Sequence, residues 1–192
     1  MTSGRTPRAT LAAALAFAAS ILALPALAAD LDFDLSNSAA HLDYRFSITD
    51  TGLDADLGLL HHDDDGDVLH AGIILVGDAA QGAEPFTAGL GARAIVVDAN
   101  VIDGTGIAIG GFFRYVMPDF NRFAIGGYAY LAPSVTSFGD LDRYMEFGVR
   151  GEYRVLDKAS VYLGLRDVSA DFAGFGDATV DDGLHVGISL EF

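Results

Sequence analysis

The sequence contains no cysteine, no tryptophan and a single lysine, Lys158. Without cysteine the chain forms no disulfide, and both thiol catalysis and cysteine-ligated metal sites are excluded. Water-soluble surfaces normally carry many lysines, so their scarcity disfavours a large solvated surface. The absence of tryptophan runs against the aromatic girdle of a membrane barrel, although 13 Phe and 7 Tyr supply other aromatic side chains.

Positive charge is also scarce. The 192 residues include 27 acidic and 11 basic side chains, for a formal net charge of −16. Such an acidic chain is not expected to bind nucleic acid or anionic membrane surfaces, whereas cations remain possible ligands. The length and the 51% hydrophobic content predict one substantial domain rather than two.

The first 28 residues have the pattern of a secretory signal. Arg5 and Arg8 precede the apolar stretch ATLAAALAFAASILAL, and the small-residue pattern Ala26-Leu27-Ala28 follows it. We expect cleavage there, so that residues 1–28 are a signal peptide and residues 29–192 form the exported domain. An uncleaved anchor helix is the alternative, but a helix made mostly of alanine is weakly hydrophobic. Later residues include no apolar run near the ~20 that a membrane helix needs.

The exported domain alternates between apolar and polar residues with period two, which predicts β-strands. The pattern is regular in five segments and less regular in five others, where glycines interrupt it. The expected strands are 31–35, 41–48, 53–59, 68–76, 86–97, 106–117, 122–131, 144–155, 159–169 and 184–192. We therefore expect an all-β fold of ten strands, with eight as the alternative if residues 31–35 stay outside the sheet and another pair of segments merges into one strand.

The connections between these strands alternate between two kinds. Longer or acidic connections are expected at 63–67, 98–105, 132–143 and 170–182, with a short one at 36–40. Tight connections are expected at 49–52, 77–85, 118–121 and 156–158. This asymmetry is typical of bacterial outer-membrane barrels, whose outer loops are long and whose periplasmic turns are short.

Alternation alone does not separate a soluble exported barrel from a membrane barrel, so the polar face must decide. That face mixes large charges of both signs with glycine, as an ion-pair network in a narrow lumen would require. We therefore predict a closed antiparallel transmembrane β-barrel in the bacterial outer membrane. The expected lumen charges are Asp43, Arg45, Asp56, Arg93, Arg114, Glu146, Arg150, Glu152, Arg154, Arg166 and Glu191.

The sequence ends with HVGISLEF, in which one apolar face reaches the terminal Phe192. Such a final strand resembles the assembly signal of outer-membrane barrels, and the barrel assembly machinery is then an expected partner. The signal residues are Leu184, Val186, Ile188, Leu190 and Phe192. The other expected partners are outer-membrane lipid and lipopolysaccharide, and the protein is expected to be a monomer.

Four segments resemble the YfaZ family of outer-membrane proteins. They are DDDGDV before a glycine-bearing apolar strand, the block GYAYLAPS, the later VRGEYRV and the terminal VGISLEF. The resemblance covers most of residues 29–192. It implies a barrel fold in the outer membrane and assigns no activity, cofactor or catalytic residue.

The densest polar cluster, His61-His62-Asp63-Asp64-Asp65-Gly66-Asp67, is followed by His70. Asp65-Gly66 is typical of a two-residue hairpin turn, which would place His61 opposite His70. One interpretation is a metal site formed by His61, His70, Asp63 and Asp65. A solvated external turn is the plainer reading, and a third is a rim hydrolase or acyltransferase with His61 or His62 as general base. No motif marks a nucleophile, so an enzyme is not expected.

The expected function is structural, or that of a narrow passive pore with a charged lumen. A small barrel is largely filled by its own side chains, which favours a plugged lumen. No cofactor is expected apart from Ca²⁺ or Mg²⁺ held weakly between external aspartates and lipopolysaccharide. The alternatives are the rim enzyme and a soluble exported β-barrel binding protein.

Overall fold

The protein is described by a computed structural model. It covers residues 28–48, 52–78, 86–99, 102–174 and 176–192. The predicted signal peptide, 1–28, lies outside the described residues except for Ala28. Within the described part of the chain, no helix is long and apolar enough to cross a membrane.

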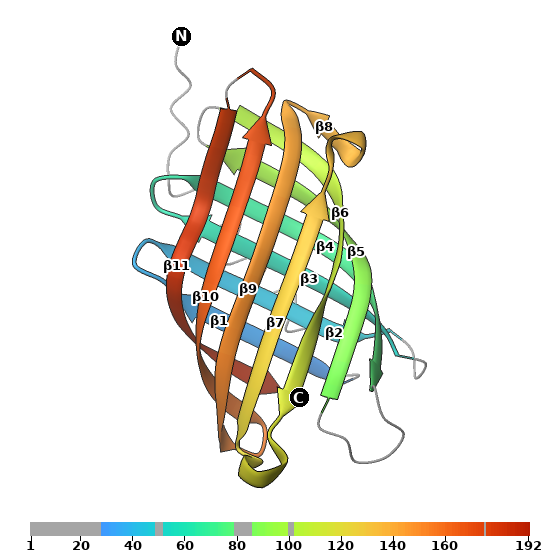
Figure 1. The fold of residues 1–192 in the computed structure, drawn as a ribbon, viewed down its shortest axis with the longest axis vertical. Helices are drawn as coiled ribbons and strands as arrows, with labels where there is room; N and C mark the ends of the chain where they lie inside the picture. The colour runs from blue at the N-terminus through green and yellow to red at the C-terminus, as the bar shows by residue number, and fades with distance from the viewer. Residues whose placement is uncertain (1–27, 49–51, 79–85, 100–101, 175) are drawn as a thin grey trace.

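The described chain is almost entirely antiparallel β-structure (Figure 1). The strands are β1 (Ala29–Leu35), β2 (Ala39–Ser47), β3 (Leu53–His62), β4 (Gly66–Asp78), β5 (Phe86–Ala99), β6 (Ile102–Val116), β7 (Phe123–Ala132), β8 (Ser137–Gly139), β9 (Leu141–Leu156), β10 (Ala159–Phe172) and β11 (Gly176–Glu191). Two short 3-10 helices, η1 (Pro118–Phe120) and η2 (Ser134–Thr136), lie in connections.

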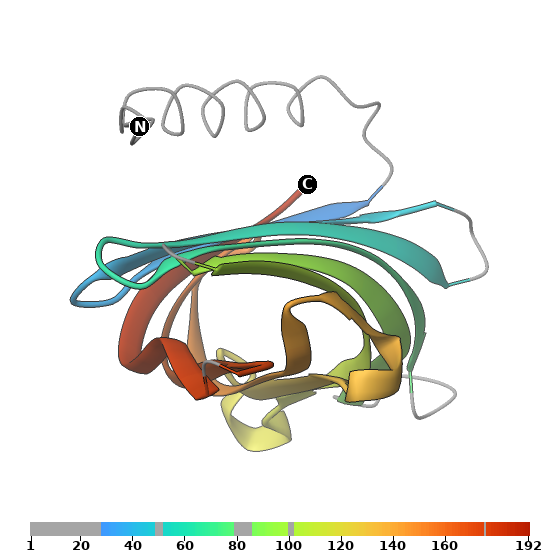
Figure 2. The ribbon, with the colours of Figure 1, turned by 90° about the horizontal axis from the view of Figure 1, so that it is seen from above.

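Ten of these strands close into a ring. The order is β5-β4-β3-β2-β1-β11-β10-β9-β7-β6, and the pairing of β5 with β6 completes the circle. The short β8 pairs with β6 inside the connection between β7 and β9. A view down the barrel shows an oval rather than a circular section (Figure 2). Because the ring is closed, each of the ten strands is hydrogen-bonded to a neighbour on both sides. A bilayer requires this, since its hydrocarbon offers no partner for backbone polar groups. The predicted closed ten-stranded barrel is confirmed, and the eight-stranded alternative is wrong.

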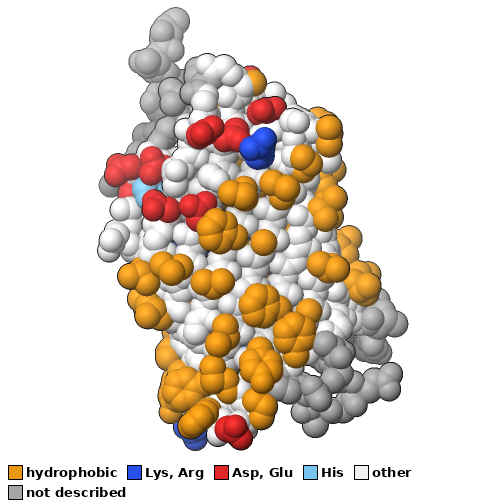
Figure 3. Space-filling model, in the orientation of Figure 1, with side chains coloured by type: hydrophobic (Ala, Val, Ile, Leu, Met, Phe, Trp, Pro, Cys, Tyr) orange, Lys and Arg blue, Asp and Glu red, His pale blue; other side chains and the backbone are white. Residues whose placement is uncertain are grey.

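The two faces of the wall have opposite character. On the outer face, Leu90 is 76% exposed and Ile109 is 63% exposed, whereas on the inner face Asp56 is 0% exposed and Arg166 is 3% exposed. Apolar side chains cover the middle and lower part of one outer face in Figure 3, with acidic side chains above them. We call this band the apolar belt. A soluble barrel has the reverse arrangement, with apolar residues inside.

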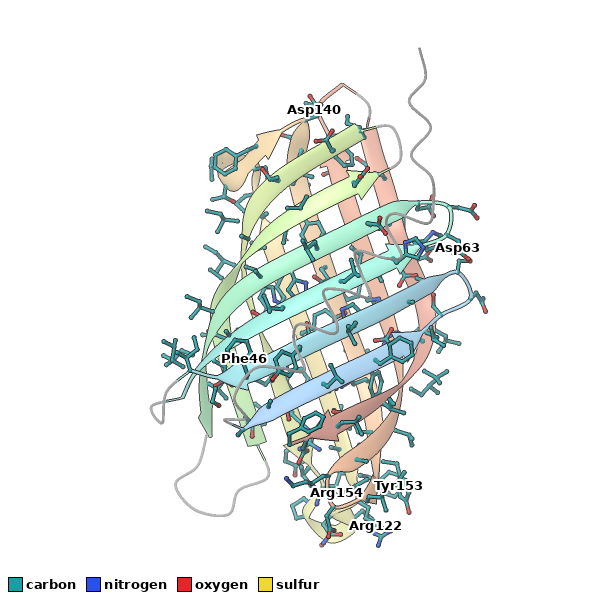
Figure 4. The ribbon with its side chains drawn as sticks, turned by 180° about the vertical axis from the view of Figure 1, so that it is seen from behind. Phe46, Asp63, Arg122, Asp140, Tyr153 and Arg154 are labelled. Carbon is teal, nitrogen blue, oxygen red and sulfur yellow. The ribbon has the colours of Figure 1, made fainter. Side chains whose placement is uncertain are left out.

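The two ends of the barrel also differ. The acidic end carries the connections after β1, β3, β5, β7 and β10, and Asp63 and Asp140 are labelled there in Figure 4. At the opposite end the same figure labels Phe46, Arg122, Tyr153 and Arg154.

The expected difference in loop length is largely wrong. Strands β5 and β6 run to Ala99 and from Ile102, and β10 and β11 run to Phe172 and from Gly176. The segments 98–105 and 170–182 are therefore mostly strand rather than loop. Only the connection after β7, residues 133–140, is long at the acidic end. Where a strand extends beyond the belt, its outer face carries polar residues. In the sequence such residues resemble a loop, so the ends of these strands were predicted as connections.

Strand β10 shows how the faces exchange character along the barrel. Leu163 and Leu165 point outward and are 58% and 52% exposed, whereas Val168 and Phe172, closer to the acidic end, are buried inside. Asp171 lies on the outer face beyond the apolar belt. Along β10 the barrel therefore changes from a membrane-type body to an end, which we call the cap, where apolar side chains point inward.

Candidate functional site

The interior at the acidic end is closed by packed apolar side chains, which we call the apolar layer. All of its members point inward and are buried, and they come from the ends of nine strands. They are Ala39, Leu60, Val68, Ile95, Val97, Ala108, Ala132, Leu141, Val168, Ala170, Phe172 and Val180. Removal of this apolar surface from water stabilises the packing at this end of the interior.

Below the apolar layer lies a set of buried charges that we call the His70 cluster: Asp43, Asp56, His70, Arg93 and Glu146. His70 Nε2 is 3.0 Å from Asp43 Oδ2 and 3.5 Å from Asp56 Oδ2. Arg93 Nε donates to Asp56 Oδ2 at 2.5 Å, and its Nη1 is 3.9 Å from Glu146 Oε2.

Arg93 also stacks on an aromatic ring, with its guanidinium carbon 3.8 Å from the ring centroid of Tyr130. His70 has room for its ring because residue 58, opposite it across the β3–β4 pair, is glycine. A side chain at Gly58 would collide with that ring, so a glycine is required by the close approach.

A second buried group surrounds Arg166, which lies on β10. Arg166 Nη1 donates to Asp34 Oδ1 at 2.9 Å, and its Nη2 donates to Asp181 Oδ2 at 2.6 Å. Asp34 Oδ2 is 3.1 Å from His41 Nδ1 and accepts from the Tyr162 hydroxyl at 3.0 Å. This group joins strands β1, β2, β10 and β11 across the point where the first and last strands of the barrel pair.

The third group is centred on Arg150. Its Nη1 donates to Asp32 Oδ2 at 2.7 Å and its Nε donates to Glu152 Oε1 at 2.9 Å. Arg114 Nε donates to the second oxygen of Glu152 at 2.7 Å. Two arginines and two carboxylates therefore balance here, which is the arrangement that buried charges require.

A cavity of about 230 Å³ lies between these groups and reaches the opposite end of the barrel, where Asp30, Thr87 and Glu191 line it. Glycines in the wall, Gly126 and Gly148 among them, leave room for it. The barrel interior thus contains a polar cavity at one end and an apolar layer at the other.

The structure places the predicted lumen residues inside the barrel or at its rim. Asp43, Asp56, Arg93 and Glu146 meet around His70, and Arg114, Arg150 and Glu152 meet further along. Arg45 lies with its guanidinium carbon 4.0 Å from the ring centroid of Phe112, and its Nε has no hydrogen-bond partner among the described residues. Glu191 is exposed at the cavity mouth opposite Asp30, and Arg154 lies at the opposite end (Figure 4).

Sequence reasoning missed several inward residues. Asp32 and Asp34 follow the regular alternation of LDFDL, so their inner placement could have been read from it. Asp181 lies in the segment 170–182 that was expected to be an outer connection, and that expectation is wrong for it, because it is only 4% exposed and pairs with Arg166. A β-bulge causes this: Val168 pairs with Asp181 and Ser169 with Thr179, so that Val180 and Asp181 both point inward.

The expected His61–His70 pair does not form. The β3–β4 register places His61 opposite Asp67 and His70 opposite Gly58, and the turn occupies Asp63–Asp65 rather than Asp65-Gly66. His61 Nδ1 is 2.5 Å from Asp67 Oδ1 on the exposed surface, whereas His70 is buried inside. The metal site predicted from His61, His70, Asp63 and Asp65 is therefore wrong. A turn one residue longer than expected changed the face on which His70 lies.

The C-terminal strand has the expected apolar outer face. Leu184, Val186 and Ile188 are exposed on the belt, and Phe192 is 54% exposed. Leu190 is half-buried beside Leu31 of β1. The assembly-signal role of these five residues stays a prediction.

A closed antiparallel barrel with an apolar belt outside and paired charges inside is a transmembrane β-barrel of the bacterial outer-membrane class. The chain belongs to the YfaZ family, because the family model described as "YfaZ precursor" matches residues 8–192. The chain is similar to the outer membrane protein YfaZ of Escherichia coli (strain K12), with 30% identity over 149 residues that cover 77% of this chain and 79% of the relative. The protein is therefore an outer-membrane protein, and the soluble alternative is wrong.

Solved barrels show weaker likeness. A KdgM porin is similar at a TM-score of 0.46 and 11% identity, covering 86% of this chain and 99% of the other. The OccK5 (OpdH) structure of Pseudomonas aeruginosa gives a TM-score of 0.27 at 13% identity, covering 80% of this chain and 58% of the other.

Proposed function

We propose that this protein is a closed outer-membrane barrel with a structural role, and that its lumen does not conduct ions. The observation that carries the proposal is the apolar layer, which fills the interior at the acidic end. An ion crosses a barrel only through connected water, and an apolar constriction disfavours water. The cavity at the opposite end is then a pocket with one mouth rather than part of a channel.

The charged groups below the apolar layer support the same proposal. Arg93 and Arg166 each bind carboxylates from other strands and lie across the lumen rather than along its wall. In a pore such charges would line a continuous water path. Here the paired side chains are buried and fill the space through which that water would pass. The ion pairs join distant strands and help to set the register of the barrel.

An enzymatic role at the outer rim has less support. His61 is paired with Asp67, and His62 Nδ1 accepts from the backbone N–H groups of Asp64 and Asp65 in the turn. Within the described residues, no serine or threonine hydroxyl is hydrogen-bonded to either histidine. A general base needs a nucleophile or a positioned water within hydrogen-bond reach.

We place the acidic end outside the cell, because the connections after β3 and β7, which were predicted as outer loops, lie at that end. Bridging of its aspartates to lipopolysaccharide by Ca²⁺ or Mg²⁺ stays a prediction, as do the contact with the assembly machinery, the monomeric state and the absence of nucleic-acid binding.

The test is conductance of the purified protein in planar bilayers. We expect no conductance steps from the wild type or from Arg150→Ala, because the apolar layer still closes the lumen when the cavity charges change. The triple variant Leu60→Ala/Val97→Ala/Phe172→Ala should open discrete conductance steps, because it removes side chains from the layer itself.

Folding of each variant is checked by the shift in electrophoretic mobility between heated and unheated samples. Discrete steps from folded wild-type protein would overturn the proposal. A change of those steps in Arg150→Ala would then make the protein a narrow pore whose selectivity depends on the lumen charges.

A further inference from the structure

The His70 cluster carries more negative than positive charge. Its carboxylates are Asp43, Asp56 and Glu146, and Arg93 lies within 4.0 Å of all three. With a neutral imidazole at His70, three negative charges and one positive charge leave a net charge of −2. All five residues are less than 9% exposed. Uncompensated charge in a buried site is costly, so the cluster favours an additional cation.

The ligand atoms of the cluster have the spacing of a metal site. One atom each from Asp43, Asp56 and His70 lies within 4.8 Å of the other two. His70 Nε2 is 3.0 Å from one carboxylate oxygen and 3.5 Å from the other. Ligands held about 2.1 Å from one divalent ion lie about 3.0 to 3.5 Å from each other, so small movements suffice.

Two buried polar atoms beside the cluster have no hydrogen-bond partner among the described residues. They are Asp56 Oδ1 and the Tyr130 hydroxyl, and their residues are 0% and 1% exposed. Tyr130 is in contact with Arg93, the cation of the cluster. Buried polar atoms are rarely left without a partner, and a bound ion with its water would supply one.

The cluster also has a route to solvent. Asp43, Arg93 and Glu146 line the cavity that reaches the opposite end of the barrel. An ion can therefore approach Asp43 from that end without passing the apolar layer.

We infer that Asp43, Asp56 and His70 bind one divalent transition-metal ion inside the barrel. The ion sits between His70 Nε2 and the two facing carboxylate oxygens, and Arg93 with Glu146 surrounds it. A charge of +2 brings the cluster to neutrality. The site is distinct from the external histidines, and it does not depend on whether the barrel conducts.

The donor set selects the class of metal. One imidazole nitrogen and two carboxylates suit Zn²⁺, Mn²⁺ and related ions, whereas Ca²⁺ and Mg²⁺ prefer oxygen ligands alone. In the general affinity order Zn²⁺ binds more tightly than Mn²⁺. Zn²⁺ is therefore the first probe, and Co²⁺ is the spectroscopic substitute.

The experiment uses protein purified from outer membranes in detergent, freed of metal with a chelator and then dialysed against Zn²⁺. We expect one zinc per chain by elemental analysis and a higher midpoint of thermal unfolding. His70→Gln should lower the affinity about 100-fold or more, because changes outside the ligand set alone cost 10–100-fold. Co²⁺ should give visible absorption bands that one equivalent of Zn²⁺ removes.

Two matched controls separate this site from other histidines. The double variant His61→Gln/His62→Gln removes the external histidines and should keep the zinc. Gly58→Ala pushes a side chain into the His70 ring and should weaken zinc binding. Gly164→Ala brings a side chain against the His185 ring and the Val149 carbonyl oxygen, and should not weaken it. Because Gly58 touches no metal, it is a positioning residue.

Zinc retained by His70→Gln but lost from the double variant would overturn the inference and assign the metal to the external turn. Wild-type protein that retains no zinc would also overturn it and would leave Arg93 and protonated His70 as the only cations of the cluster. If His70→Gln does not fold, the Co²⁺ spectra of the wild type, the double variant and Gly58→Ala decide the question.

Discussion

The cap at the acidic end and the body of the barrel are built from the same strands, yet they bury opposite kinds of side chain. In the body, Leu163 and Leu165 face outward and Arg166 lies inside. In the cap, Asp171 faces outward and Val168 and Phe172 lie inside. A strand crossing from lipid into water must exchange its apolar face, because the surrounding medium changes from hydrocarbon to water while the strand period does not.

The interiors of the cap and the body are stable for different reasons. The cap relies on apolar burial, as soluble proteins do. The body already faces lipid with its apolar residues, so its interior is filled by charged groups that pair with one another. Substitutions in the two regions should therefore change the free energy of unfolding by different amounts.

The largest effect is expected in the body. Arg166→Met should lower the free energy of unfolding by about 3–5 kcal/mol, because it leaves the buried carboxylates of Asp34 and Asp181 without their arginine. The measurement is urea unfolding followed by circular dichroism, since the chain lacks tryptophan. The control is Arg143→Met, which removes an exposed pair 3.6 Å from Asp171 and should cost less than about 1 kcal/mol. Equal losses of stability from Arg166→Met and Arg143→Met would show that the buried ion pairs do not hold the body together.

A smaller effect is expected in the cap. Ile95→Val removes one methylene from the apolar layer and should cost about 0.5–1.5 kcal/mol, the usual range for a packed core. The same unfolding measurement applies. Ile109→Val makes the identical change on the outer belt, where lipid can refill the space, and should cost less. A greater cost at Ile109 would argue against a tightly packed layer.

The smallest effect is expected on the outer face of the cap. Asp171 lies directly opposite Asp177, and burial together with this neighbouring carboxyl raises the pKa of Asp171 above its usual value. The folded state then holds its proton more readily than the unfolded state, so stability falls as pH rises through that pKa. Asp177→Asn should add about 0.2–1 kcal/mol at pH 7 and nothing at pH 3, where Asp171 is protonated and the repulsion between the two carboxylates is lost. Unfolding midpoints at the two pH values check this, and an equal gain at both would rule out the charge explanation.

Much of the fold could be predicted because the signal is local. Each long strand overlaps a predicted segment, since the alternation of residues such as Leu184, Val186 and Ile188 requires only neighbouring positions. The inner placement of Arg150 and Glu152 follows from the same alternation. On β10 the apolar residues change from odd to even positions between Leu165 and Val168. This change in the alternation could have predicted the cap from the sequence.

The candidate site was harder to predict because its contacts join distant strands. His70 meets Asp43 and Asp56 only through the β2–β3–β4 register, and a turn one residue longer than expected placed it inside rather than beside His61. Asp181 lies in a segment predicted as an outer connection, but the bulge opposite Val168 and Ser169 directs its side chain inward.

Period-two alternation and the mixture of charges on the polar face can be recognised within single segments, and they are enough to predict a ten-stranded outer-membrane barrel. Which charges pair, where the interior is closed and which end has a cavity cannot be recognised in this way. Those features depend on strand register and barrel closure. Both bring together residues more than 100 positions apart, such as Asp32 with Arg150 and Asp34 with Arg166.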